Sequence, residues 1–499
     1  MRTQSTFDER YGAERGSCVT EGAPTATIRK PIERGLLVAR RTTRIATRTL
    51  SQAVTRRRGP DEVRAIWVQG FKSLETPCRL EIRPLTLLAG PNSSGKSSLF
   101  QPLLLMKQTV ESAYDPGPLL LDGPNVKVAS ARQLFTHRAG HEDVDQSFCA
   151  GFDLSNDRSL SVTFELPPTR RGVKLKSMTI TEPAVGFENL VLSTPLSSES
   201  SHIVNRLPKS TFTLTEGKPR KSKWVVEPRR CFLDLQEEIS EGDISFRFNS
   251  PVLQATQVVE KQLTNTIHLP GLRGNPERSY PRTAVGRSYP GQFQDYVASI
   301  IHGWQVRRSP SLAAVATGLE ELGLTWKVAS REVDDTRVEL QVGRLPHAQR
   351  GGARDLVNIA DVGLGTSQIL PVLVALEAAQ RGELVLLEQP EIHLHPRAQS
   401  ALARALARAA RRGVRVIAET HSSLLLRGVQ TLVAKNELAA ADVSLHWFTR
   451  DPITGMSSVT SAELDDFGRF GDWPEDFDDV ALNSEAAYLD AVEEKASAR

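Results

Sequence analysis

Residues 85–98 read LTLLAGPNSSGKSS, and they give the strongest indication of the fold. The first five residues are apolar apart from one threonine and predict a short buried strand, and the apolar spacing over residues 97–110 predicts a helix. Between them, residues 90–97 match the pattern G-x-x-x-x-G-K-S/T without a mismatch. This pattern binds phosphate groups when a strand precedes it and a helix follows it. The sequence therefore predicts a site for the triphosphate of a nucleotide.

The residue types in this loop each have a chemical role. Gly90 and Gly95 let the backbone curl so that its N–H groups point at phosphate oxygens, and the following helix adds its N-terminal dipole. Lys96 is expected to bind the β- and γ-phosphates, and the Ser97 hydroxyl is expected to bind Mg²⁺. The other expected phosphate-binding residues are Pro91, Asn92, Ser93, Ser94 and Ser98. ATP and Mg²⁺ are the ligands that this loop predicts.

A second motif combines an apolar strand with carboxylates at its end, since residues 384–396 read LVLLEQPEIHLHP. A carboxylate at the carboxyl end of a sheet strand lies in the ligand crevice of an α/β fold, so Glu388 is expected to hold the Mg²⁺ shell. Gln389 stands where a hydrolytic glutamate would activate water, and an amide can orient water but cannot accept its proton. Glu391 either substitutes in this role or belongs to a solvated loop. The two histidines of the motif have no further Cys or His nearby, which favours a structural role over metal binding.

Four motifs follow one another along the chain: GPNSSGKSS from residue 90, DVGLGTSQILP at 361–371, LLEQPEIHLHP ending at 396, and ETHSSLLL at 419–426. Together they resemble the ABC-type ATPases of the SMC, RecF and OLD group. They are most similar to compact bacterial AAA-type proteins that carry E-Q-P-E-h-H-L-H-P. The run HLPGLRGNPERSY at residues 268–280 is also similar to that subset, and the resemblance covers most of residues 63–430.

The resemblance implies a head-to-head dimer in which a signature loop of one subunit caps the γ-phosphate held by the other. Gly363, Gly365 and Ser367 match this loop, and Gly363 replaces the serine that such loops usually carry. His421 matches the switch histidine that contacts the γ-phosphate in the family, so it joins Gln389 and Glu391 as a candidate catalytic residue. Gln108 matches the lid glutamine of these proteins.

The expected fold class is α/β, a P-loop NTPase with an ABC-ATPase-like two-lobed head and an inserted β-rich and helical region. Helices at 367–379 and 398–412 alternate with apolar strands at 384–387 and 414–418, which is typical of a sheet covered on both faces. The expected parts are a disordered basic extension at 1–60, an N-terminal ATPase lobe at 61–130, an inserted region at 131–345, a C-terminal ATPase lobe at 346–450 and an acidic tail at 451–499.

Composition excludes several other protein classes. The chain has 499 residues, of which 39% are hydrophobic and 24% charged, as in a soluble globular protein. No apolar run approaches the ~18 residues that cross a bilayer, and the four cysteines form no C-x-x-C pair, so we expect a cytoplasmic protein without structural zinc or membrane contact. Residues 1–60 carry 13 Lys/Arg against 5 Asp/Glu, whereas residues 451–499 carry 3 against 13.

Three groups of basic residues are candidates for contact with phosphate or DNA. Arg273 and Arg278 flank a Gly/Pro turn and either reach phosphates or a partner or lie in a solvated loop. A basic cluster lies at residues 218–224, and one predicted helix carries Arg404, Arg408, Arg411 and Arg412. Because runs of charge more often face solvent, contact with DNA stays open.

The resemblance implies an ATPase that dimerises around two ATP molecules and whose nucleotide state controls an effector protein, in phage defence or DNA maintenance. Because of Gln389, two hypotheses remain: slow hydrolysis, or a regulatory module in which ATP holds the dimer without being hydrolysed. A third hypothesis is a DNA-binding clamp of the SMC or RecF kind. About fifty residues follow the last predicted strand, too few for a nuclease domain, so we do not expect the chain to cut DNA itself.

Overall fold

The computed structural model describes residues 62–137, 146–168, 172–207, 220–241, 244–249, 253–347, 355–471, 486–490 and 495. The expected disordered extension at 1–60 lies outside the described residues. The first two residues of the basic cluster and most of the acidic tail beyond residue 471 also lie outside them.

Strand β3 (Leu85–Ala89), which precedes the phosphate-binding loop of residues 90–97, is fully buried inside a six-stranded sheet. The sheet has the order β11-β16-β17-β3-β18-β19, and β3 runs parallel to both of its neighbours. The other strands are β11 (Ile267–Leu269), β16 (Leu384–Glu388), β17 (Arg415–Glu419), β18 (Val443–Arg450) and β19 (Ser457–Ala462). Since all but β19 are parallel, the carboxyl ends of five strands meet at one edge of the sheet.

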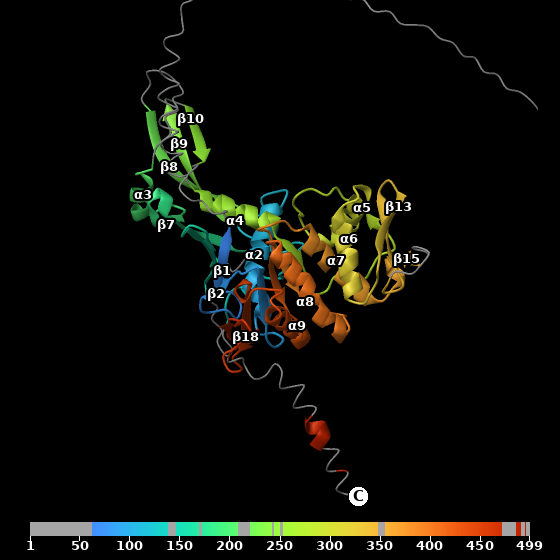
Figure 1. The fold of residues 1–499 in the computed structure, drawn as a ribbon. Coiled ribbons are helices and arrows are strands. Elements are labelled where there is room, and N and C mark those ends of the chain that lie inside the picture. Colours follow the sequence, from blue (N-terminus) through green and yellow to red (C-terminus); the bar gives the residue numbers. More distant parts are fainter. Residues whose placement is uncertain are drawn as a thin grey trace, which may run out of the picture. The chain divides into compact units, whose positions relative to one another are not determined.

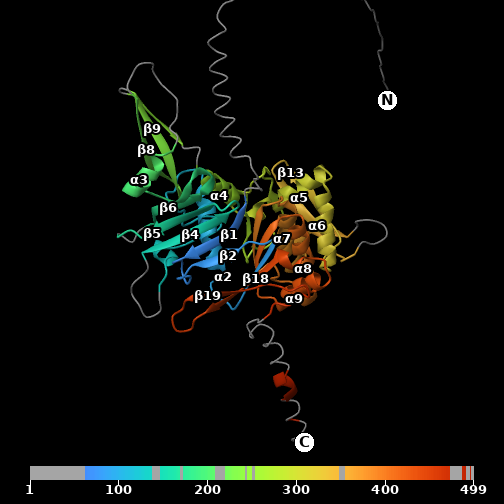
Figure 2. The ribbon, with the colours of Figure 1, turned by 60° about the vertical axis from the view of Figure 1, so that its left-hand side comes forward.

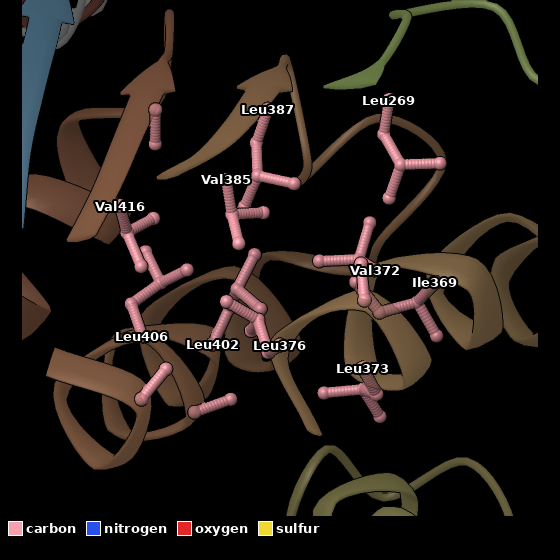
Figure 3. Close-up of a cluster of buried hydrophobic side chains, with 14 of the residues drawn as sticks. Leu269, Ile369, Val372, Leu373, Leu376, Val385, Leu387, Leu402, Leu406 and Val416 are labelled. Atoms are coloured by element: carbon pink, nitrogen blue, oxygen red, sulfur yellow. The ribbon is translucent and has the colours of Figure 1, made fainter. Parts of the chain in front are cut away.

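Helices cover one face of this sheet with apolar side chains. These are α7 (Leu364–Ala378), α8 (Pro396–Arg411) and α9 (Ser423–Ala434), which are labelled in Figure 1. Figure 3 shows the packing for the strand residues Val385, Leu387 and Val416 and the helix residues Leu376, Leu402 and Leu406. The alternate residues Leu386 and Ile417 belong to a second core cluster on the opposite face, together with Leu103 and Leu104 of α2 (Lys96–Glu111). Burial on both faces explains why these strands are continuous apolar runs.

A second six-stranded sheet is antiparallel and has the order β2-β1-β4-β5-β6-β7. Its strands are β1 (Val63–Gln69), β2 (Cys78–Glu81), β4 (Ser147–Leu154), β5 (Ser159–Glu165), β6 (Lys174–Glu182) and β7 (Phe187–Ser193), and β1, β4, β5 and β6 can be followed side by side in Figure 2. Because β1 pairs with β4, the sheet contains residues from both sides of the expected boundary at residue 130.

Two smaller sheets complete the described fold. One consists of β8 (Arg220–Arg229), β9 (Phe232–Glu241) and β10 (Ile244–Asn249); the other consists of β12 (Tyr280–Pro281), β13 (Val328–Asp334), β14 (Arg337–Gly343) and β15 (Leu356–Asn358). The remaining α-helices are α3 (Ser198–Val204), α4 (Gln254–Asn265), α5 (Val297–Val306) and α6 (Pro310–Glu321). A 3₁₀ turn (Phe293–Tyr296) leads directly into α5. Among the described helices, none combines the length and the apolar character needed to cross a membrane.

Candidate functional site

The phosphate-binding loop folds as a tight bend whose two glycines cannot be replaced without a clash. Gly90 has a φ of 138°, and a Cβ at this position would lie 2.2 Å from the Phe448 carbonyl oxygen. Gly95 has a φ of 97°, and its Cβ would lie 2.4 Å from the Ser457 hydroxyl. Pro91, Asn92 and Ser93 form the exposed tip of the bend, Ser94 is buried, and Ser98 donates its N–H to the Gly95 carbonyl at 3.0 Å.

Lys96 begins α2 and turns its side chain back into the loop. Its Nζ donates to the carbonyl oxygens of Gly90 (3.1 Å) and Pro91 (2.8 Å), and it lies 3.8 Å from Glu419 Oε1. Burial lowers the pKa of Lys96, and the Glu419 carboxylate partly offsets that effect. The ammonium group is therefore held inside the loop by two neutral acceptors and by the Glu419 carboxylate 3.8 Å away, where an incoming phosphate can compete for it.

Glu419, at the carboxyl end of β17, is the carboxylate that the fold brings to Ser97. Ser97 Oγ donates to Glu419 Oε2 at 2.7 Å. Burial raises the pKa of Glu419; the carboxylates of Glu388 and Glu391 act in the same direction, and Ser97 and Lys96 oppose them. No role is predicted for Glu419 from the sequence. The rule applied to Glu388, a carboxylate at a strand end, would have found it.

A cavity of about 770 Å³ opens beside the loop. Its volume lies within the ~300–1,000 Å³ of small-molecule and cofactor sites. The lining is rich in cations and hydroxyl groups: Lys72, Ser73, Ser93, Gly95, Lys96, Ser97, Ser98, Gln101, Ser130, Arg132, Gln133, Phe135, His137, Glu419, Arg450 and Gly455. Glu419 is the one carboxylate among these lining residues, so the cavity suits a polyanion that a divalent cation partly neutralises.

Glu388 lies at the same sheet edge but turns away from this cavity. Its Oε1 lies 3.1 Å from His268 Nε2, and its Oε2 accepts the Gly271 N–H at 3.2 Å. Burial alone would raise the pKa of Glu388, but the bonds from His268 and Gly271, with the charge of Arg273, hold it below its ordinary value. Glu388 pairs with Glu419 across the parallel strands, and it does not line the cavity.

Arg273 holds the segment after Glu388. From the sequence, this arginine either reaches phosphates or a partner or lies in a solvated loop. Arg273 is buried and donates to the carbonyl oxygens of Glu388 (3.2 Å), Gln389 (3.1 Å) and Gln368 (3.3 Å). Burial lowers the pKa of Arg273 to about 10, and Glu391 and Glu388 oppose the effect. Gln389 adopts a φ of 44° and donates its N–H to the Glu419 carbonyl at 2.8 Å. Such a conformation needs support from its surroundings.

The Glu391 side chain bonds to the backbone of His421. Glu391 Oε1 accepts from Thr420 Oγ1 (2.7 Å) and from the His421 N–H (2.9 Å), and its Oε2 is buried without a hydrogen bond in the described structure. Burial lowers the pKa of His421, Lys96 acts in the same direction, and a hydrogen bond with the Gly90 backbone opposes both. His421 therefore lies beside the phosphate-binding loop. Glu391 is buried next to His421 and does not lie in a solvated loop.

Gly363, Gly365 and Ser367 gather at the start of α7 and not at the cavity. Gly363 is the N-cap and has open space around it, whereas a Cβ on Gly365 would lie 3.2 Å from the His393 carbonyl oxygen. Ser367 Oγ donates to the Leu364 carbonyl at 3.1 Å. None of the three lines the cavity of the same chain.

Several other expectations have simpler structural explanations. The Gln108 side chain is buried and bonds to the backbone of Leu120, Asn125 and Val126, so it supports that loop and does not line the cavity. Arg278 forms an exposed ion pair with Asp361. The helix arginines are partly neutralised, because Arg408 pairs with Glu321 and Arg412 with Glu377. His395 caps α8 by accepting the Arg397 N–H, and no metal-binding cluster of His, Cys, Asp and Glu occurs among the described residues.

A family model described as "AAA domain, putative AbiEii toxin, Type IV TA system" matches residues 85–427. A search of curated proteins found no match. The α/β P-loop NTPase fold predicted from the sequence is confirmed by the sheet described above and by this match.

The solved structures to which this chain is similar include head domains of SMC proteins. The SMC head bound to the C-winged helix domain of ScpA has 11% identity, a TM-score of 0.43, and coverage of 81% of this chain and 98% of that one. The SMC head domain from Thermotoga maritima has 11% identity, a TM-score of 0.37, and coverage of 81% and 100%. The Pyrococcus furiosus Smc head with an extended coiled coil, bound to the C-terminal domain of ScpA, has 10% identity, a TM-score of 0.40, and coverage of 87% and 100%.

Proposed function

Because this chain belongs to the AAA domain family whose model matches residues 85–427, we propose that it binds ATP with Mg²⁺ in the cavity beside the phosphate-binding loop. The observation that carries the proposal is the meeting of three chain segments at the loop. Lys96 lies inside it, Glu419 bonds to Ser97 from the neighbouring strand, and His421 contacts Gly90. Backbone N–H groups, an ammonium and an imidazole then surround the phosphates.

The residues at the loop fit a hard divalent cation. The Ser97 hydroxyl and the Glu419 carboxylate provide oxygen ligands at the start of α2, which is the donor type that Mg²⁺ prefers. When bound, Mg²⁺ would neutralise charge on the phosphates. Glu419 would hold this cation directly or through water, and Glu388, its neighbour across the strand pair, would add negative charge behind it.

Gln389 decides whether the bound nucleotide is hydrolysed. It follows Glu388 at the end of β16, and its backbone N–H bonds to the Glu419 carbonyl. An amide at this position could orient water but could not remove a proton. We therefore propose slow ATP hydrolysis. A regulatory module that binds ATP without hydrolysing it is the second candidate, and the same amide favours it.

The exposed start of α7 supports a dimer. Gly363 has no neighbouring atom within 4 Å of an added Cβ, and none of Gly363, Gly365 and Ser367 lines the cavity of its own chain. The exposed Gly363 would instead face the nucleotide of a second copy, with Gly365 and the buried Ser367 behind it. ATP would then close the dimer and control an effector protein, and the family description as a toxin of a type IV TA system supports a role in defence.

ATP with Mg²⁺ is expected to double the molar mass of the protein in light scattering, because each nucleotide would join two copies. Gly363→Glu should bind ATP as the wild type does and stay monomeric, since the site has room for the side chain but the added carboxylate would face the phosphates of the partner. Lys96→Ala should stay monomeric because it binds ATP weakly. A wild-type protein that binds ATP and stays monomeric would reject the dimeric switch and leave ATP binding intact.

A further inference from the structure

The turn between β18 and β19 follows the part of the chain that matches the family model, which ends at residue 427. Figure 2 labels both strands of this hairpin. Asp451 organises the turn: its Oδ1 accepts the N–H groups of Ile453 (2.9 Å) and Thr454 (2.7 Å). The Gly455 N–H donates to the Asp451 carbonyl at 2.9 Å. The turn therefore has a defined conformation of its own.

Ser457 fixes this turn to the phosphate-binding loop. Its Oγ donates to the Ser94 carbonyl at 2.6 Å, and its N–H donates to the Ser73 carbonyl at 2.8 Å. The contact is close enough that Gly95 has no room for a side chain on that side. The hairpin therefore holds the loop through the carbonyl groups of Ser93 and Ser94, whereas those of Gly90 and Pro91 accept from Lys96.

Arg450, the last residue of β18, lines the same cavity as Lys96. Its Nε donates to the Gly455 carbonyl at 2.9 Å and its Nη1 to the Ser93 carbonyl at 3.3 Å. Neutral carbonyls are its acceptors, and within the described part of the chain no carboxylate forms an ion pair with it. Two bonds thus fix the position of the guanidinium, and three of its five N–H donors remain for a ligand.

We propose that Arg450 contacts the phosphate chain of the bound nucleotide, from a wall of the cavity that lies outside the matched family domain. This inference rests on the proposed ATP binding. A planar guanidinium with free donors suits phosphate oxygens, to which it can donate two parallel bonds. Its anchors on Ser93 and Gly455 mean that little side-chain freedom is lost when it binds.

Calorimetric titration with Mg²⁺-ATP and with Mg²⁺-tripolyphosphate tests this proposal. Arg450→Ala should weaken both ligands about tenfold, because a charge-assisted bond to phosphate is lost. Arg450→Lys should recover part of the affinity, since it keeps the charge without the planar donors. Thr449→Ala is the matched control: it removes the cross-strand bond with Ser458 in the same hairpin, does not line the cavity, and should change either affinity less than twofold.

Thermal unfolding first verifies that the variants are folded, and the titrations then show whether Arg450 contacts the phosphate chain. Unchanged ATP affinity in Arg450→Ala would overturn the proposal. A loss for ATP without a loss for tripolyphosphate would also overturn it, because Arg450 would then face the nucleoside. A wild-type protein that binds neither ligand would refute the proposed function itself, which separates that failure from a wrong assignment of Arg450.

Discussion

Replacing Gln389 by glutamate is expected to raise steady-state phosphate release about 100-fold or more above the wild-type rate. A positioned general base contributes roughly 10²–10⁴-fold to a reaction of this kind, and the amide of Gln389 cannot act as one. The two side chains have the same shape, so the left-handed backbone at φ 44° and its bond to the Glu419 carbonyl should persist. Phosphate release at saturating ATP and Mg²⁺ measures the effect.

Gln380→Glu is the control for the added charge, because Gln380 is exposed and lies outside the site. It should leave the rate unchanged. A Gln389→Glu protein that binds ATP normally without a faster rate would show that residue 389 does not reach the attacking water. Absence of phosphate release from the wild type, with intact ATP binding, would favour the non-hydrolysing regulatory module.

Replacing Glu419 by glutamine is expected to remove most of the advantage that Mg²⁺ gives to ATP binding. The buried carboxylate accepts the Ser97 hydroxyl and lies 3.8 Å from Lys96, so it is the negative charge best placed to hold the cation. Loss of a hydrogen bond to a charged group costs roughly 1.5–3 kcal/mol, or about 10- to 150-fold in affinity. The ratio of ATP affinity with Mg²⁺ to that with EDTA should fall by about this factor.

Stability separates a ligand-binding role of Glu419 from a structural one. Burial disfavours the charge of Glu419, but glutamine would also leave the buried Lys96 without the carboxylate 3.8 Å away. Because these two effects oppose each other, the unfolding temperature of the ligand-free protein should change little. The exposed Glu437→Gln variant should keep the wild-type dependence on Mg²⁺. If Glu419→Gln binds ATP with the wild-type dependence on Mg²⁺, the carboxylate does not serve the cation.

The local parts of the site could be predicted from the sequence because short stretches encode them. The strand at residues 85–89 and the helix after the loop occur where the apolar pattern placed them, as do β16 and β17 to within one residue. Each of these elements is specified by its own spacing of apolar residues and by the glycines or prolines that bound it.

The partners of the strand-end side chains could not be predicted, since they depend on the order of strands in the sheet. Glu419 reaches Ser97 because β17, and not β16, lies next to β3. Glu388 is one strand further away, where His268 and Gly271 from a distant segment bind it. The sequence indicates that a carboxylate lies at the end of a strand, but it does not indicate which strand lies next to β3.

The same limit applies to Arg273 and to the expected boundary at residue 130. Arg273 occurs in a run of Gly, Pro and polar residues that is equally typical of a solvated turn, and only the folded chain buries it among three carbonyl groups. The pairing of β1 with β4 joins segments about eighty residues apart, as Ile66 and Phe152 are Cα partners. No local signal in either strand identifies the other.

Calorimetric titration of wild-type protein and Lys96→Ala with Mg²⁺-ATP tests most directly whether the phosphate-binding loop holds a nucleotide. Lys96 is buried in the loop by the carbonyl groups of Gly90 and Pro91, so its removal should weaken binding at least tenfold, while the exposed Lys435→Ala should bind as the wild type does. Equal ATP affinity in wild type and Lys96→Ala, with both proteins folded, would show that the phosphate-binding loop does not bind the nucleotide.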